Sequence, residues 1–308
     1  MKFPFFTCFL AVLYALFAHE MANADAAETL DSTARTAVMS AFQPEWTALE
    51  AMLQDRKDHI VNGMTFATGT IEGKPVVLFL SGVSMVNAAM TTQLALDRFN
   101  IARIVFSGIA GGVDPGLAIG DVVVPVEWSE YLEAVFAREK DGGYTLPSYA
   151  NQPLAYYGMI FPQPVQITKR GGGLEQRMWF PADAQLLAIA KTAASTTVLK
   201  DCVADDKCLT HKPKIVVGGH GVSGQAFVDN KAFRQYARKT FDAEALDMES
   251  AAVAHVAYAN RIPFIAFRGL SDLAGGDEGE NEMGTFFQLA SDNSASVVRA
   301  FLKALPKS

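Results

Sequence analysis

The segment from Ala245 to Ala274 constrains the fold more than any other part of the sequence. A short strand leads into a helix of small residues that ends near Asn260, and a continuous apolar run, Phe-Ile-Ala-Phe, follows Pro263. Proline cannot continue a helix, and an unbroken apolar run is typical of a buried parallel strand. Glu249 precedes the helix and Asp272 ends the second strand, so both acids are expected at strand ends, where open α/β sheets bind ligands. The segment therefore predicts an α/β fold with two acids facing one crevice.

Length and composition favour one domain. The chain has 308 residues, of which 50% are hydrophobic, enough for one large α/β core. We therefore expect a single domain over residues 25–308, without an internal repeat or an interdomain linker. The net charge is -7, and Lys and Arg are scattered instead of forming a basic stripe, which argues against a nucleic-acid partner.

Residues 1–24 have the features of a secretory signal peptide. Lys2 is followed by a short apolar run, and Ala22-Asn23-Ala24 has the small residues of a cleavage site. A membrane anchor is the alternative, but the apolar run is short for a spanning helix. We predict cleavage after Ala24, export of the mature chain to the periplasm or out of the cell, and no membrane attachment afterwards.

The mature chain keeps two cysteines, Cys202 and Cys208, close together in the segment CVADDKC. Such a pair in an exported chain favours a local disulfide, with two free buried thiols as the alternative. No metal site is expected, because further ligands do not follow at metal-binding spacing, and His211 and His220 form no ligand pattern. The glycines after Ser107 lack dinucleotide-binding spacing, so no cofactor is expected.

The other predicted elements alternate as in α/β proteins. We expect strands at 34–39, 64–70, 76–80, from 104 into a glycine cluster, from 121, and at 215–219. Helices are expected from 44, and at 85–99, 181–197, 231–239 and 282–305. Residues 127–180 form a long irregular excursion whose aromatic residues either line a pocket or pack the excursion itself.

Local sequence pattern gives Glu45 a structural role and argues against Ser223 as a nucleophile. Glu45 lies in the first turn of the helix that begins at Pro44, where an acid interacts favourably with the helix dipole. Ser223 is followed by Gly-Gln, which does not fit the glycine spacing of a serine-hydrolase nucleophile elbow.

Four short motifs together resemble the nucleoside phosphorylase superfamily, specifically its methylthioadenosine/S-adenosylhomocysteine nucleosidase branch. The first two motifs are Ala-Phe-Gln-Pro-Glu at 41–45 and Ser-Gly-Ile-Ala-Gly-Gly at 107–112, the latter with Gly-Asp at 120–121. The other two are Ser-Gly-Gln-Ala-Phe-Val at 223–228, and Met-Glu at 248–249 with Ser-Asp at 271–272. The resemblance extends from about Arg35 to the final helix. It implies a single-domain three-layer α/β/α sandwich with a central mixed β-sheet. The sequence departs from the family at Phe42 (Met in the family), Ile109 (Ser) and Gln225 (Asp).

The resemblance also implies a role for each motif. Glu45 would activate water and Asp272 would protonate the departing base, so these two are the expected catalytic residues. Glu249 would bind the ribose hydroxyls, and Phe227 would stack on the purine. The full set of expected substrate-binding residues is Phe42, Val83, Ile109, Phe227, Val228, Met248, Glu249 and Ser271.

The implied activity is hydrolysis of the N-glycosidic bond of a purine nucleoside by a homodimer in which a neighbour completes the 5′ pocket. A phosphorylase is the first alternative. Phe106 lies where phosphorylases of this fold carry an arginine, and Glu45 would repel phosphate, so hydrolysis is favoured. A non-catalytic nucleoside-binding or storage protein on the same fold is the second alternative, and the three acids argue against it. The 5′ substituent of the substrate stays open.

Overall fold

A computed structural model describes residues 29–204, 207–277 and 279–306. The predicted signal peptide, residues 1–24, lies outside the described residues. No helix within the described ranges is both long enough and apolar enough to span a membrane.

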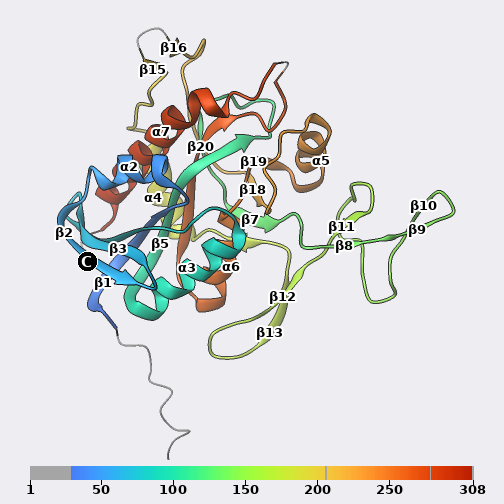
Figure 1. The fold of residues 1–308 in the computed structure, drawn as a ribbon, viewed down its shortest axis with the longest axis horizontal. Helices are drawn as coiled ribbons and strands as arrows, with labels where there is room; N and C mark the ends of the chain where they lie inside the picture. Colours follow the sequence, from blue (N-terminus) through green and yellow to red (C-terminus); the bar gives the residue numbers. More distant parts are fainter. Residues whose placement is uncertain (1–28, 205–206, 278, 307–308) are drawn as a thin grey trace, which may run out of the picture.

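A mixed 12-stranded sheet forms the centre of the molecule (Figure 1). Its long strand β5 (Phe99–Gly112) pairs in parallel with β1 (Asp31–Ser40) and β20 (Phe264–Asp272), and antiparallel with β19 (Ala243–Asp247). One side continues from β1 through β4 (Lys74–Leu80) and β3 (Met64–Ile71) to β2 (Gln54–Val61). The other side continues from β19 through β18 (His220–Ser223) and β7 (Glu127–Glu130) to β14 (Phe180–Pro181), while β6 (Val122–Val124) joins β20 to β17 (Ile215–Val217).

Helices cover both faces of this sheet, so the fold has the three α/β/α layers that the resemblance implies. On one face α3 (Met85–Arg98) and α6 (Ser250–Asn260) pack together, and on the other face α2 (Gln43–Glu50), α4 (Ala184–Ala194) and α7 (Met283–Ala304) share a core. α5 (Lys231–Phe241) lies beside β18 and β19. Alternate residues of β20 enter the two cores, since Phe264 and Ala266 face one and Ile265 and Phe267 face the other. The apolar run of β20 is therefore buried on both faces, as predicted.

Three parts of the chain differ from the sequence expectations. β2 was not predicted, because its sequence QDRKDHIV is highly charged; it lies mostly exposed at the sheet edge, where charged residues discourage pairing with another chain. β5 does not stop at the glycine cluster but continues through it to Gly112. α2 begins at Gln43, one residue before the predicted start of this helix, and ends at Glu50.

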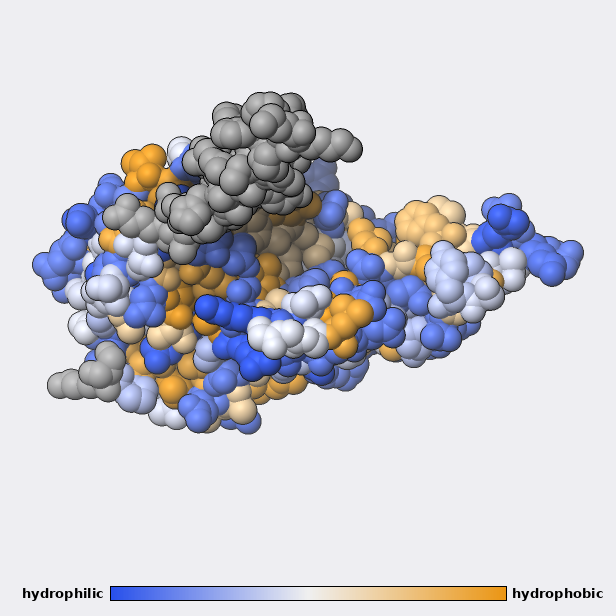
Figure 2. Space-filling view, turned by 90° about the horizontal axis from the view of Figure 1, so that it is seen from below, coloured by the Kyte–Doolittle hydropathy of each residue, from blue (hydrophilic) through white to orange (hydrophobic). Residues whose placement is uncertain are grey.

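Residues 127–180 are more ordered than predicted. After β7 the chain forms three two-stranded hairpin pairings: β8 (Ala134–Phe136) with β11 (Ile160–Pro162), β9 (Arg138–Lys140) with β10 (Gly143–Thr145), and β12 (Val165–Thr168) with β13 (Leu174–Arg177). β8 to β11 form an arm that projects well beyond the body of the molecule (Figures 1 and 2). Ring stacking of Tyr156 on Phe161, with centroids 4.3 Å apart, packs the arm against itself.

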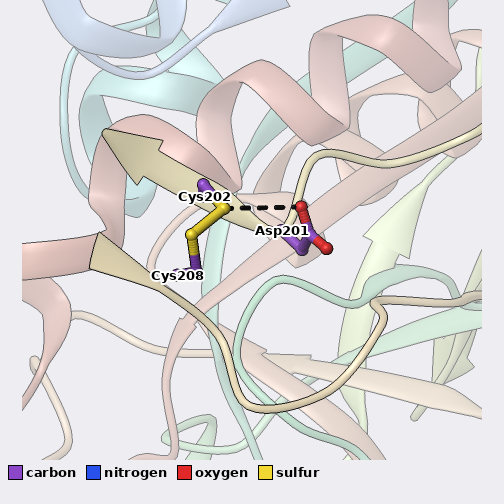
Figure 3. The surroundings of a disulfide bond; sticks show 3 residues. All are labelled: Asp201, Cys202 and Cys208. Atoms are coloured by element: carbon purple, nitrogen blue, oxygen red, sulfur yellow. Dashed lines mark hydrogen bonds between the residues drawn. A yellow bond between two sulfur atoms is a disulfide. The ribbon is translucent and has the colours of Figure 1, made fainter. Parts of the chain in front are cut away.

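The two cysteines lie on a separate small hairpin of β15 (Cys202–Ala204) and β16 (Lys207–Cys208). Their sulfur atoms are 2.01 Å apart, at bonding distance, beside Asp201 (Figure 3). The hairpin extends away from the sheet, above α7 in Figure 1.

Candidate active site

Several strands end at one cavity of about 230 Å³. Every residue that the sequence analysis assigned to catalysis or substrate binding lines it: Phe42, Glu45, Val83, Ile109, Phe227, Val228, Met248, Glu249, Ser271 and Asp272. The cavity is also lined by residues to which the sequence analysis gave no role: Ala41, Ala110, Gly111, Ala226, Leu246, Asp247 and Met283. The three acids Glu45, Glu249 and Asp272, which are far apart in the sequence, thus converge on one cavity.

Arg268 lies behind this cavity and was missed by the sequence analysis. Its side chain is fully buried, and its guanidinium is 2.7 Å from Asp247 Oδ2, 3.7 Å from Glu249 Oε2 and 3.9 Å from Glu45 Oε1. It also donates from Nε to Ser250 Oγ at 2.9 Å and lies over the ring of Phe106. The sequence signal that could have indicated Arg268 is a charged residue within an otherwise apolar strand, because a buried arginine needs nearby anions.

Gly108 makes room for this charge cluster. A Cβ atom at position 108 would lie 1.9 Å from Arg268 Nη1 and 2.7 Å from Glu45 Oε1. Both contacts are shorter than any real Cβ contact, so a side chain there would displace the guanidinium or the carboxylate. Gly108 thus serves close packing inside β5.

Glu45 is held by three main-chain donors. The N–H of Ala41 donates to Oε2 at 2.6 Å, that of Phe42 to the same oxygen at 3.4 Å, and that of Ile109 to Oε1 at 2.8 Å. The bond from Phe42 belongs to the start of α2, so the structural role that local pattern assigns to Glu45 coexists with its place in the cavity. Burial raises the pKa of Glu45, and the charge of Arg268 together with the three N–H donors opposes that rise.

Glu249 and Asp247 flank the start of α6. Glu249 Oε1 accepts the N–H of Ser84 at 2.7 Å, and burial raises its pKa against the opposing charge of Arg268. Asp247 Oδ1 accepts from Ser223 Oγ and from the N–H groups of Glu249 and Ser250. Asp247 therefore fixes the turn that presents Glu249, and it supplies a second negative charge that also raises the Glu249 pKa.

Asp272 has no cation among its hydrogen-bond partners in the described structure. Its Oδ1 accepts the N–H of Ala274 at 2.8 Å, and its Oδ2 is 2.9 Å from Ser271 Oγ. Burial is the largest influence and raises its pKa, while these hydrogen bonds oppose the rise. A carboxyl group in this environment keeps its proton to higher pH than an exposed aspartic acid.

An aromatic and apolar wall completes the cavity. Phe227 is 54% exposed, although its ring lines the cavity. The Oη of Tyr131, which is buried, donates to the carbonyl of Ala226 at 3.1 Å and so supports the segment that carries Phe227. Among the residues that the structure describes, no group of three or more His, Cys, Asp or Glu has a metal-binding arrangement.

Comparison with known proteins relates the whole domain to one family. The model of the phosphorylase superfamily matches residues 35–303. The 5′-methylthioadenosine/S-adenosylhomocysteine nucleosidase of Listeria innocua is 31% identical over 269 residues, which cover 87% of this chain and 98% of that protein. Bark storage protein A of Populus deltoides is 28% identical over 267 residues, 82% of each chain.

A solved structure agrees with the sequence matches. The 5′-methylthioadenosine/S-adenosylhomocysteine nucleosidase of Neisseria meningitidis, in complex with methylthio-immucillin-A, superposes with a TM-score of 0.67 at 26% identity. The superposition covers 89% of this chain and 100% of that one. The chain therefore belongs to the phosphorylase superfamily, together with the 5′-methylthioadenosine/S-adenosylhomocysteine nucleosidases.

Proposed function

We propose that this protein hydrolyses the N-glycosidic bond of purine nucleosides, with 5′-methylthioadenosine and S-adenosylhomocysteine as the first substrates to test. The observation that carries the proposal is the convergence of Glu45, Glu249 and Asp272 on one cavity. Family membership supports it, since relatives over most of the chain are named as nucleosidases of these compounds.

Asp272 is the proposed general acid. A purine leaves as a poor anion unless a ring nitrogen is protonated, and a carboxyl group serves best when it holds its proton near the working pH. Burial raises the pKa of Asp272 in this direction. Phe227 offers a ring face on which the same base stacks.

Glu45 and Glu249 act on the sugar side. Glu45 orients a water molecule and takes its proton as the water adds to the anomeric carbon. Glu249 accepts hydrogen bonds from the ribose hydroxyls and places negative charge near the cation-like sugar of the transition state. Arg268 holds these two carboxylates in place from behind, and Met248 offers a polarisable surface to the sugar.

The lining of the cavity favours water over phosphate as the nucleophile. It includes the carboxylates of Glu45, Asp247, Glu249 and Asp272, and none of its described lining residues is Lys, Arg or His. Arg268 is nearby, but it is fully buried and already faces three of these carboxylates. The net negative charge of the cavity would repel a phosphate dianion, whereas it would not repel a neutral water molecule.

The storage-protein alternative has one specific observation in its favour, the similarity to bark storage protein A. The intact and buried acid set favours an enzyme, because a binding role does not require three carboxylates whose burial costs free energy.

We further propose that the mature chain is exported and forms a homodimer through the face that includes α3. Val83, Val86 and Met90 on this face are 44%, 67% and 54% exposed, and Val83 also lines the active-site cavity. A second hollow of about 240 Å³ between α3 and α6 extends this apolar face. A partner on this face would therefore lie beside the substrate.

The Asp272→Asn variant is expected to lose base release while keeping its melting temperature nearly unchanged. An amide keeps the shape and still accepts the Ala274 N–H, but it supplies no proton, so turnover should fall by about 10²–10⁴-fold. In the unmodified protein, turnover should fall as pH rises through the Asp272 pKa, because only the protonated acid acts. Both expectations are checked by the rate of adenine release from 5′-methylthioadenosine, compared between variant and wild type and measured for the wild type across pH. Glu280→Gln, which changes an exposed acid in the segment after β20, is the matched control and should behave as wild type. A fully active Asp272→Asn variant would remove Asp272 from the mechanism.

Product analysis separates the three functional alternatives. With purine nucleosides and inorganic phosphate, the protein should release free ribose or thioribose at a rate that phosphate does not raise. Chromatographic separation of ribose from ribose 1-phosphate makes the measurement. Formation of ribose 1-phosphate would establish a phosphorylase, and tight nucleoside binding without base release would establish the storage role.

Native mass spectrometry of the protein recovered from its own cells tests export and assembly together. The expected species contains two copies, each beginning at Asp25 after removal of residues 1–24. A Val86→Asp variant should dissociate into single copies, because a charge would be buried in the proposed interface. Recovery of the wild type as single copies would contradict the dimer, and an N-terminus at Met1 would contradict signal cleavage.

A further inference from the structure

Ile109 is the residue whose main chain contacts both the Glu45 carboxylate and the buried Arg268 guanidinium. Its N–H donates to Glu45 Oε1 at 2.8 Å, and its carbonyl accepts from Arg268 Nη1 at 3.3 Å. Parallel pairing with Gly269 of β20 fixes this part of β5 from the other side. The position of the Ile109 side chain relative to the Glu45 carboxylate is therefore set by the sheet.

The side chain of Ile109 enters the cavity at this point. β5 contributes Ile109, Ala110 and Gly111 to the lining, so Ile109 is the one large side chain among them. The Cα atom that carries this side chain is bonded to the nitrogen that donates to Glu45 Oε1. A branched apolar group thus stands next to the carboxylate.

Glu45 has little free surface for a nucleophile to approach. The side chain is 2% exposed, and its two oxygens already accept main-chain N–H groups of Ala41, Phe42 and Ile109. A nucleophile that gives its proton to Glu45 must lie within hydrogen-bonding distance of these oxygens and hence close to the Ile109 side chain.

From this geometry we propose that Ile109 selects the nucleophile by size, admitting water to Glu45 and excluding larger oxygen nucleophiles. The inference rests on the proposed hydrolase function and adds a specificity-determining residue to it. The rejected reaction is a balanced one: an alcohol oxygen bonds to the anomeric carbon and its proton passes to Glu45. The bond from that carbon to the base nitrogen breaks, and the base leaves with its electron pair and a proton from Asp272.

Methanol is the smallest nucleophile that distinguishes these cases. The experiment incubates 5′-methylthioadenosine with the full protein in buffer containing methanol, and measures the ratio of the methyl glycoside of methylthioribose to free methylthioribose. This ratio reports the choice of nucleophile and does not depend on the rate. Wild type should give almost only methylthioribose. Ile109→Ala should raise the ratio by about tenfold or more, since one methylene of an apolar pocket already changes discrimination by about 10–200-fold.

Two further variants keep the inference open to refutation. Ile109→Val removes a single methylene with little risk to folding, and its ratio should lie between those of wild type and Ile109→Ala. Ile60→Ala trims an exposed isoleucine of the edge strand β2 that does not line the cavity, so its ratio should equal that of wild type. An unchanged ratio in both Ile109 variants, or an equal rise in Ile60→Ala, would overturn the role of Ile109 while leaving hydrolysis intact. Failure of wild type to release adenine would instead overturn the proposed function itself.

Discussion

The placement of one buried guanidinium determines how the acids of this cavity are arranged. Arg268 is fully buried and faces three carboxylates from two segments, Glu45 from the start of α2 and Asp247 and Glu249 from the turn before α6. Removing a charged partner from a buried cluster of this kind typically costs about 3–5 kcal/mol, because the remaining charges lose their compensation. The cluster therefore couples the position of the proposed catalytic acid Glu45 and of Glu249 to the stability of the fold.

The central sheet makes this cluster possible. β5 and β20 run side by side in parallel, which places Arg268 beside Gly108 and Gly269 beside Ile109. A glycine at each of these positions allows dense packing, since a Cβ atom on Gly269 would lie 2.1 Å from the carbonyl oxygen of Ala290 in α7. Asp272, the third acid of the cavity, is the last residue of the same strand β20. Two neighbouring strands thus position the base-side acid, the buried cation and the main-chain donor to Glu45.

The separation of charge within the cavity follows from this arrangement. Arg268 and main-chain donors oppose the burial effect on Glu45 and Glu249, whereas Asp272 is stabilised only by Ser271, Asn281 and a main-chain N–H. A proton donor must start protonated, whereas a proton acceptor must start ionised. Asp272, which has no cation among its described hydrogen-bond partners, suits donation, and Glu45, which faces Arg268, suits acceptance. Hydrolysis of a glycosidic bond between a base and a sugar needs both.

Sequence patterns predicted the central elements because their signals are local. The apolar run of β20, the proline before it and the small residues of α6 specify a buried strand and a packed helix without further context. The same patterns missed β2, whose charged sequence becomes a strand only through pairing with β3, and they ended β5 too early, because glycines signal a turn unless the tertiary packing that needs them is known. Arg268 was missed for a related reason: its partners come from segments far apart in the sequence, and no local spacing records their meeting. The strand-helix-strand pattern alone placed Glu249 and Asp272 at the ligand-binding edge of the sheet. Most of the other site residues were expected from motif resemblance, and chemical pattern alone gave Glu45 only a helix-start role.

The most direct test of the central claim is a crystal structure of the Asp272→Asn variant with 5′-methylthioadenosine bound. The three-acid arrangement predicts the purine against Phe227 with a ring nitrogen at residue 272, the ribose hydroxyls on Glu249, and a water molecule between Glu45 and the anomeric carbon. A nucleoside bound outside this cavity, or bound with its sugar turned away from Glu45 and Glu249, would contradict the account.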